Sequence, residues 1–277
     1  METEIYDSVR FINFLDYPER VPDQNTIWLF RERLSKTGKD KTLWKEVWRQ
    51  FMEKGITVRA GTIQDAAFIE SDPGHRRRDK LDVVDPQMPP VKTEKKDSST
   101  EQAPRVERKL AEQRAEERKN TKTRRSKDGT WTKKYSRSYF GFKLHTILGA
   151  ENDMIANYSV TTASLHDSQI DLSIPGIVNY NDKAYFGVEG RGIDAAMDRA
   201  LRGHELPIES IRRNLRIARK KSRGERPYSV MKRTFRGNHT FVTTVPRVRV
   251  KAMFMWVGHN LSNLSSQTRR GRVTTAI

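Results

Sequence analysis

Residues 138–164, SYFGFKLHTILGAENDMIANYSVTTAS, contain two runs in which apolar and polar side chains alternate. A period of two is the pattern of β-strands that bury one face. The residues between the runs, Ala-Glu-Asn-Asp at 150–153, are typical of a turn. The stretch therefore predicts a β-hairpin and makes a sheet the basis of the fold.

Two further strands are predicted, one on each side of this hairpin in the sequence. Upstream, the β-branched and apolar residues of 62–69 surround a single acid, Asp65. Downstream, the apolar run 176–182 ends at Asp182, and open α/β sheets place their functional sites at the carboxyl ends of strands. Between the hairpin and this last strand, residues 165–174 are predicted to start a helix.

A helical pair is predicted near the amino terminus. Residues 22–38 and 40–55 both carry apolar side chains at helical spacing and both end at a glycine, which gives a pair of helix-turn-helix size. Such a pair either packs as a subdomain or contacts DNA. Trp28, Trp44 and Trp48 are expected in the core rather than as platforms for base stacking.

The carboxyl-terminal part is predicted to be helical. Residues 192–235 are rich in Arg and Lys and are expected to form basic helices. Residues 248–264 have the apolar periodicity of a helix that lies mostly in the core.

The overall charge favours a polyanionic partner. Lys and Arg number 53 against 35 Asp and Glu, which gives a formal charge of +18. Nucleic acid is the leading candidate and an anionic membrane the second. No apolar stretch approaches the roughly 18 residues of a spanning helix, and the acidic start lacks the basic region of a secretory signal. We therefore expect a cytoplasmic protein that binds DNA and no membrane.

Residues 71–136 differ in composition from the rest of the chain. They consist largely of charged residues with Pro, Ser and Gln, which predicts a charged, largely disordered insertion. This segment explains why the hydrophobic share of 35% lies below the roughly 45–50% usual for globular chains. Its end, residues 122–137, mixes basic and aromatic side chains and suits contact with a phosphate backbone.

Three acids lie where a carboxylate needs an explanation: Asp65 in a strand, Asp182 at a strand end and Glu225 at a helix start. Pro227 fits only the first turn of a helix, which places Glu225 at its beginning and Lys232 two turns later on the same face. With 0 Cys, a metal must be held by carboxylate or imidazole, which favours Mg²⁺ or Mn²⁺. Three carboxylates could hold the two cations of a phosphodiester-cleaving site. Taken singly, they also suit a strand-end hydrogen bond, a turn and a helix cap.

Two histidines offer a second candidate site. His145 and His166, with Asp167, could bind a metal, but no His-x-x-x-His spacing supports this. Structural or substrate-contacting roles are favoured for them.

Five strings in fixed order resemble the DDE transposases of prokaryotic insertion sequences, IS-five group. They are GTIQDAAFI at 61–69, YFGFKLHT at 139–146, TTASLHDSQ at 161–169, NDKAYFG at 181–187 and GERPYSVMKR at 224–233. The resemblance extends over residues 8–265. It implies an α/β fold, an RNase H-like mixed sheet flanked by helices, with a helical N-terminal DNA-binding region and a charged insertion.

The resemblance also implies roles for the acids. Asp65, Asp182 and Glu225 match the family's catalytic acids, which bind the metal ions, and the expected cofactor is Mg²⁺ or Mn²⁺. Lys232, seven residues after Glu225, matches the family's DNA-contacting lysine.

Basic residues around these acids are expected to contact DNA. In the wider superfamily a Tyr and an Arg precede the Glu, whereas this chain has Ala218 and Lys221 there. The roles of that Tyr and Arg are therefore lost or passed to Arg219 and Lys220. The predicted DNA-binding residues are Lys183, Tyr185, Arg219, Lys220, Lys221, Lys232 and Arg233.

Five regions are expected along the chain. They are a helix-turn-helix-like DNA-binding region (1–57), the first catalytic strand (58–70), the charged insertion (71–136), the remainder of the catalytic domain (137–265) and a flexible tail (266–277). Family members tend to have a longer amino-terminal helical region, so the resemblance implies that this chain is truncated there.

The function implied is that of a DDE transposase. It would cut transposon ends at the terminal inverted repeats and join them to target DNA, acting as a homo-oligomer on DNA. Two alternatives remain open: a catalytically inactive DNA-binding remnant and a simple metal-dependent nuclease.

Overall fold

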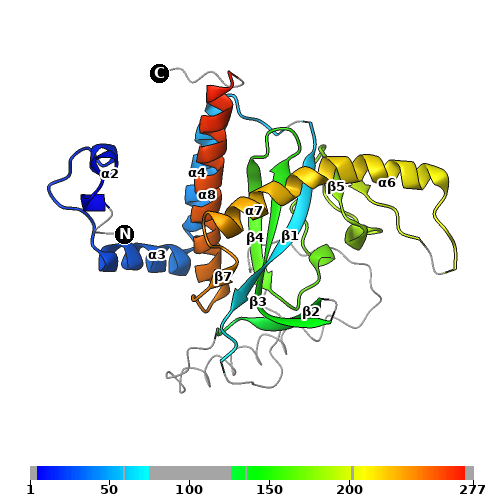
Figure 1. Ribbon diagram of the computed structural model, residues 1–277, viewed down its shortest axis with the longest axis horizontal. Helices are drawn as coiled ribbons and strands as arrows, with labels where there is room; N and C mark the ends of the chain where they lie inside the picture. The colour runs from blue at the N-terminus through cyan, green and yellow to red at the C-terminus, as the bar shows by residue number, and fades with distance from the viewer. Residues whose placement is uncertain (1–4, 59, 75–125, 135, 201–202, 272–277) are drawn as a thin grey trace.

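The computed structural model describes residues 5–58, 60–74, 126–134, 136–200 and 203–271, which fold as a mixed α/β structure around a curled sheet (Figure 1). Within these residues the sheet contains seven strands. They are β1 (Thr62–Ser71), β2 (Thr130–Lys134), β3 (Arg137–Gly149), β4 (Ile155–Thr162), β5 (Val178–Asn181), β6 (Ile193–Ala196) and β7 (His239–Thr240). Of the expected insertion 71–136, residues 75–125 lie outside the described residues, whereas β2 at its end belongs to the sheet.

The long strand β3 organises the sheet. It pairs antiparallel with β1 on one edge and with β4 and β2 on the other. The strands β5 and β6 continue the sheet beyond β1 as parallel strands, and β7 pairs with the end of β1. The hairpin predicted at 138–164 and the strands predicted on either side of it are confirmed.

Gly141 allows β3 to lie tightly against β1. A Cβ atom at this position would be 2.1 Å from the carbonyl oxygen of Ile69. At Gly141, β3 also passes from pairing with β2 to pairing with β4. A side chain here would therefore separate strands that the long sheet needs in contact.

Helices cover one face of the sheet. The helix α8 (Val245–Arg269) packs on β4 and is contacted by α3 (Gln24–Thr37), α4 (Asp40–Glu53) and α7 (Glu225–Arg233) (Figure 1). Met253 and Trp256 of α8 are fully buried in a core that includes Phe142 and Leu144 of β3. The core helix predicted at 248–264 is therefore confirmed, and it extends past residue 265 into the expected tail, of which residues 272–277 lie outside the described residues.

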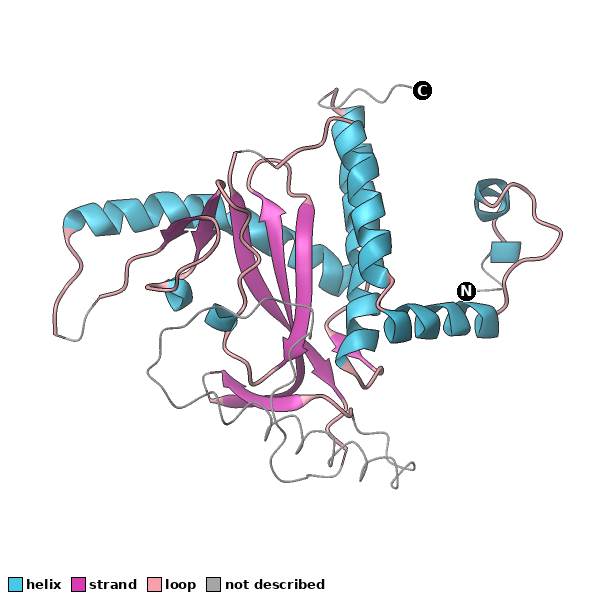
Figure 2. Cartoon of the chain, turned by 180° about the vertical axis from the view of Figure 1, so that it is seen from behind, coloured by secondary structure: helices cyan, strands magenta, loops and turns pink. Residues whose placement is uncertain are grey.

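The opposite face carries short turns and loops rather than long helices (Figure 2). A smaller apolar cluster of Ile147, Leu165, Ile170 and Leu172 fills the space beneath them. This face is covered by the chain that links β4 to β5.

The predicted amino-terminal helices are confirmed as α3 and α4. The Asp23 carboxylate accepts a hydrogen bond from the Thr26 amide at 2.7 Å, which caps the start of α3. Gly38 ends the helix in the left-handed conformation, with φ of 68°. The boundaries follow the local caps because cap residues satisfy backbone groups that the helix itself leaves unpaired.

The helix α4 packs as part of the main body. The Trp44 and Trp48 indole N–H groups donate to the carbonyl oxygens of Ala156 and Ile155 on β4, at 3.3 Å and 3.0 Å. The expectation that all three tryptophans lie in the core is wrong for Trp28, which is 56% exposed on α3. The amino-terminal part of α3 extends away from the body of the protein (Figure 1), and α3 joins the core through Leu34, in its second half.

The helix expected at 165–174 is wrong. Only a single 3-10 turn, η1 (Asp167–Gln169), forms, and the chain then becomes extended. Gln64 of β1 is the physical reason, because its amide donates to the Ile170 carbonyl at 2.6 Å and accepts from the Leu172 amide at 3.0 Å. These two bonds hold the backbone in an extended form against the sheet.

The strand β6 lies in a segment expected to be helical. The Ile193 amide donates to the Ile177 carbonyl at 3.0 Å, and parallel pairing with β5 follows. The pairing supplies backbone hydrogen bonds that override local helix propensity.

The remaining helices match the predicted basic, helical segment. The helix α6 (Ile208–Lys221) is followed by a 3-10 turn, η3 (Ser222–Gly224), and by α7. As predicted, Glu225 is the first residue of α7 and Pro227 lies in its first turn. None of the helices in the described part of the chain has the length and apolar character needed to cross a bilayer.

Candidate active site

The parallel pairing of β1 with β5 places Asp65 and Asp182 side by side across the two strands. In the parallel pairing of β1 with β5, Ile63 is opposite Tyr180, and each acid follows two residues later in its strand direction. Asp65 lies within β1, and Asp182 is the first residue after β5. Two acids 117 positions apart in the sequence therefore become neighbours on adjacent parts of the chain.

Lys221 joins the two acids. Its Nζ atom lies 3.6 Å from Oδ1 of Asp65 and 3.5 Å from Oδ2 of Asp182. Lys221 is the last residue of α6, and its side chain is mostly buried. Lys221 is one of the predicted DNA-binding residues, and its contact with the two acids is not predicted from the sequence. No local signal identifies it, because the position of the ammonium depends on how α6 lies over β5.

The Lys221 ammonium offsets only part of the cost of burying the negative charge of Asp65. Burial raises the pKa of Asp65 above its ordinary value, and the negative charge of Asp182 adds to the rise. The Lys221 ammonium and the Ala66 amide act in the opposite direction but do not reverse it. A further positive charge at this position would therefore stabilise the ionised carboxylate.

Tyr228 fixes α7 to the strand that carries Asp65. Its hydroxyl donates to the Asp65 carbonyl at 2.7 Å. Because that proton is used, Thr146 is the donor in the 2.6 Å contact between its hydroxyl and the Tyr228 hydroxyl. Tyr228 is not among the site residues predicted from the sequence. It lies one turn after Glu225, so it also fixes where the start of α7 lies relative to the acids.

Glu225 does not join Asp65 and Asp182, which we call the acid pair. It is exposed at the start of α7. The residue before it, Gly224, lies against β1, because a Cβ there would be 3.0 Å from Cγ2 of Ile63. In the part of the chain that the structure describes, no three His, Asp or Glu side chains are close enough together to hold a metal ion. The structure therefore brings together two of the three predicted acids.

Two arginines secure the start of α7. Arg223 Nε and Arg226 Nη1 each lie 3.1 Å from a carboxylate oxygen of Asp153, in the turn between β3 and β4. Asp153 has a positive φ of 54°, a conformation that Asp adopts more readily than most residues. The turn of the hairpin thus helps to position the helix that carries Glu225.

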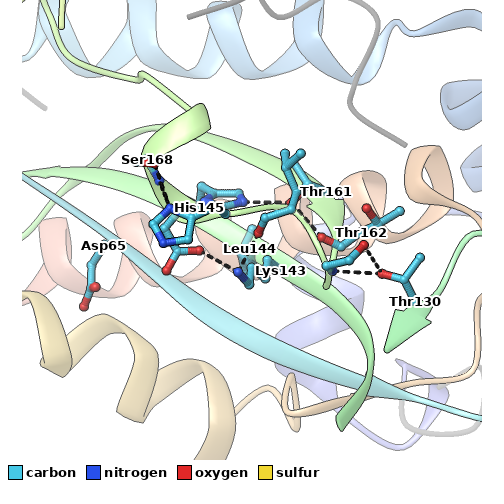
Figure 3. Close-up of polar contacts among 12 residues, drawn as sticks. Asp65, Thr130, Lys143, Leu144, His145, Thr161, Thr162 and Ser168 are labelled. Atoms are coloured by element: carbon cyan, nitrogen blue, oxygen red, sulfur yellow. Dashed lines mark hydrogen bonds and ion pairs between the residues drawn. The ribbon is translucent and has the colours of Figure 1, made fainter. Parts of the chain in front are cut away.

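His145 belongs to the other face of the sheet. It is opposite Ala66 in the β1–β3 pairing, and Ala66 points away from the face that carries Asp65. Its Nε2 atom lies 2.8 Å from the Thr161 hydroxyl (Figure 3). Burial lowers the pKa of His145 to about 4. On the same face, Lys143 forms an ion pair with Asp167 at 3.0 Å. His145 is therefore a neutral, buried structural histidine, one of the two roles favoured from the sequence.

The predicted DNA-binding residues divide into exposed and buried groups. Tyr185 is only 6% exposed, and burial raises the pKa of its hydroxyl. Lys221 is mostly buried against the acids. The exposed members are Lys183, Arg219, Lys220, Lys232 and Arg233.

Comparisons of this chain with protein-family models, with curated proteins and with solved structures find no match. The inference of function therefore depends on Asp65, Asp182 and the residues around them.

Proposed function

We propose that this chain is a DDE-type DNA transposase that cuts transposon ends and joins them to target DNA. The observation that carries the proposal is the pairing of Asp65, within β1, with Asp182, at the end of the adjacent parallel strand, around one positive group. Acids at these two positions are those that the resemblance to the transposase family assigns to catalysis.

The sheet supports the same proposal. The strands β4, β3 and β1 are successively antiparallel, β5 and β6 continue parallel to β1, and helices flank the sheet. We infer that this is the RNase H-like catalytic domain that the resemblance implies. Asp182 then lies at the carboxyl end of β5, where α/β sheets place their sites, and Asp65 lies beside it within the adjacent parallel strand β1.

The donor set fits a hard divalent cation. Carboxylate oxygens are the ligands that Mg²⁺ and Mn²⁺ prefer, and Asp65 and Asp182 already face a cationic group, the Lys221 ammonium. Asp65 and Asp182 would hold the cation, with Glu225 of α7 as the proposed third ligand. Bound there, two cations would activate the attacking oxygen and stabilise the leaving oxygen at phosphorus.

The chain's own residues would hold and orient the DNA. Arg219 and Lys220 are exposed next to Lys221 at the end of α6, and Lys183 is exposed next to Asp182. Lys221, once displaced from the carboxylates, would have a phosphate as its alternative partner. Binding through such contacts weakens steeply with salt, because counterions are released from the DNA.

The test is cleavage and joining of a labelled duplex that carries the element's own terminal repeat, in the presence of Mg²⁺. We expect the wild-type protein to cut and join, and Asp182→Asn to bind DNA but do neither. Glu189→Gln is the matched control, because it removes the same charge from an exposed position seven residues away and should retain activity. Retention of cleavage by Asp182→Asn would contradict the assignment, and cutting without joining would indicate a simple metal-dependent nuclease.

A catalytically inactive DNA-binding remnant is the second candidate. Two observations favour it: Lys221 lies between the acids, and Glu225 lies outside the pair. In that case wild type and Asp182→Asn would bind the duplex equally well, and neither would cut it with Mg²⁺ or Mn²⁺.

A further inference from the structure

The amino-terminal arm, defined as residues 5–30, exposes an unusual amount of apolar surface. The helix α2 (Val9–Phe14) in this arm buries none of its residues. Phe14 is 83% exposed and Val9 76% exposed. The exposed large apolar residues of the arm are Tyr6, Val9, Phe11, Phe14, Tyr17, Trp28, Leu29 and Phe30. Clustered exposed apolar side chains of this kind mark an interaction surface.

A second exposed apolar surface lies on α6. Ile208, Ile211 and Leu215 are spaced by three and four residues, so they form one stripe along the helix. Ile208 is 64% and Leu215 57% exposed, and Ile217, on the opposite side of the helix, is the only buried residue of α6. We call these three residues the α6 stripe. It stops before the basic residues at the end of α6 that the proposed function assigns to DNA.

The arm and the α6 stripe lie too far apart to meet within one chain. Figure 1, which has the longest axis of the molecule horizontal, shows the arm at one end and the start of α6 at the other. The view from behind shows the same separation (Figure 2). Any contact between the two surfaces must therefore join two copies of the chain.

The charges of the two surfaces are complementary. The arm has a net charge of −2, from the four acids Asp7, Asp16, Glu19 and Asp23 and the two arginines Arg10 and Arg20. The helix α6 has a net charge of +5, from four Arg, two Lys and Glu209. An acidic, aromatic arm on a chain of charge +18 is suited to a basic protein surface and not to DNA phosphates.

We propose that the arm of one copy docks its aromatic side chains on the α6 stripe of a second copy. The contact removes apolar surface of both elements from water, and Arg212, exposed beside the stripe, faces the acids of the arm. Exchange of arms about a two-fold axis makes the same contact twice and closes the assembly as a dimer. The association does not need DNA, and it stands independently of the catalytic proposal.

Cysteine cross-linking tests the pairing directly, since the chain has 0 Cys. Phe14→Cys and Leu215→Cys are made as separate proteins, mixed without DNA and oxidised. We expect a disulfide-linked dimer of one copy of each variant. Lys54→Cys, at an exposed position at the end of α4, replaces Phe14→Cys as the matched control and should give no such product with Leu215→Cys. Cross-linking of Phe14→Cys only with itself would overturn the proposal, as would absence of the mixed product.

The mass of the uncross-linked protein gives a second, independent test. Light scattering over a range of concentrations is expected to show a wild-type dimer, with dissociation constants raised on the order of tenfold or more in Phe14→Ser and Leu215→Ser. Because both side chains are exposed in the single chain, the unfolding midpoint of the monomeric variants should match that of monomeric wild type. A wild-type protein that is monomeric at all concentrations would overturn the proposal, and so would variants that dimerise as well as wild type.

Discussion

Two clusters of charged residues link the helices of this protein to their surroundings, and they differ in geometry. Between α4 and α8, Arg249 contacts both carboxylate oxygens of Asp40, at 2.6 Å and 2.9 Å, and both side chains are buried. At the end of α6, Lys221 lies 3.6 Å and 3.5 Å from single oxygens of two acids, Asp65 and Asp182. The first cluster is neutral, whereas the second has one positive charge for two negative charges.

The difference separates a structural ion pair from a site that can accept another ion. The Asp40–Arg249 pair uses both carboxylate oxygens and is closed to solvent. The acid pair has a deficit of positive charge, and the Asp182 side chain is 53% exposed. A buried, fully matched pair holds two helices together, whereas a loose and partly exposed pair leaves oxygen atoms available for a cation.

Breaking the buried Asp40–Arg249 pair should have the largest effect on the free energy of unfolding. Asp40→Asn removes the carboxylate that neutralises buried Arg249, and we expect it to lower the free energy of unfolding by about 3–5 kcal/mol. Urea denaturation measures the loss. The double variant Asp40→Leu, Arg249→Met should recover part of it, because neither charge is then buried alone. The matched change in the cluster of Lys221, Asp65 and Asp182, called the open cluster, is Lys221→Met, which should cost less because the half-exposed Asp182 carboxylate is solvated by water when its partner is removed. Equal losses for Asp40→Asn and Lys221→Met would contradict the comparison.

His145 extends the comparison to a buried group that stays uncharged. Burial lowers its pKa to about 4, so between about pH 6.5 and pH 4 the unfolded chain binds a proton that the folded chain does not. The stability contributed by the neutral ring is present above pH 6.5 and is lost as the pH falls toward 4, by up to about 3 kcal/mol.

Urea unfolding of wild type and His145→Gln at pH 7 and pH 4 checks this expectation. The decrease in stability between the two pH values should be smaller in the variant, which lacks the titrating ring. His166→Gln, at an exposed position on the same side of the sheet, should keep the wild-type decrease. Parallel pH profiles for wild type and His145→Gln would show that burial of this ring does not control the acid sensitivity.

Tyr228 tests how firmly the open cluster is positioned. Tyr228→Phe removes the donor to the Asp65 carbonyl and the acceptor for Thr146, and we expect a loss of about 1–3 kcal/mol in the free energy of unfolding. Tyr139→Phe on β3 is the control with the same chemical change, and it should alter the free energy of unfolding little. If the Tyr228 variant is as stable as the Tyr139 variant, α7 is not fixed to β1 through this hydroxyl.

The smallest expected effect concerns cation binding at the open cluster. Lys221→Met removes the ammonium that competes for Asp65 and Asp182, so we expect Mn²⁺ to bind on the order of tenfold more tightly, which corresponds to about 1.4 kcal/mol. Titration followed by electron paramagnetic resonance measures the affinity without any reaction. Lys220→Met is the control, because Lys220 is exposed and lies next to Lys221 in the sequence. Unchanged or weaker Mn²⁺ binding in Lys221→Met would contradict competition between the two cations.

Much of the fold could be predicted because its causes are local. Alternating apolar residues defined the hairpin of β3 and β4, and the cap residues Asp23 and Gly38 defined α3. Pro227 located the start of α7 for the same reason, since proline fits only the first helical turn. The setting of Asp65 and Asp182 at strand positions also followed from these patterns.

Other features depend on contacts between distant parts of the chain. Gln64 holds residues 170–172 extended, and β5 recruits β6 as a strand, so helix propensity in both segments is overridden. Lys221 reaches the acids only because α6 lies over β5, a placement that no spacing in its own helix specifies.

The sequence by itself determined the hairpin of β3 and β4, the strands β1 and β5 with their acids, and the helices α3, α4, α7 and α8. The tertiary structure alone decided that Asp65 and Asp182 share one ammonium, that Glu225 stays apart from them and that the aromatic arm is left exposed. The physical reason is that backbone hydrogen bonds and caps act over a few residues, whereas charge pairing and burial depend on which elements pack together.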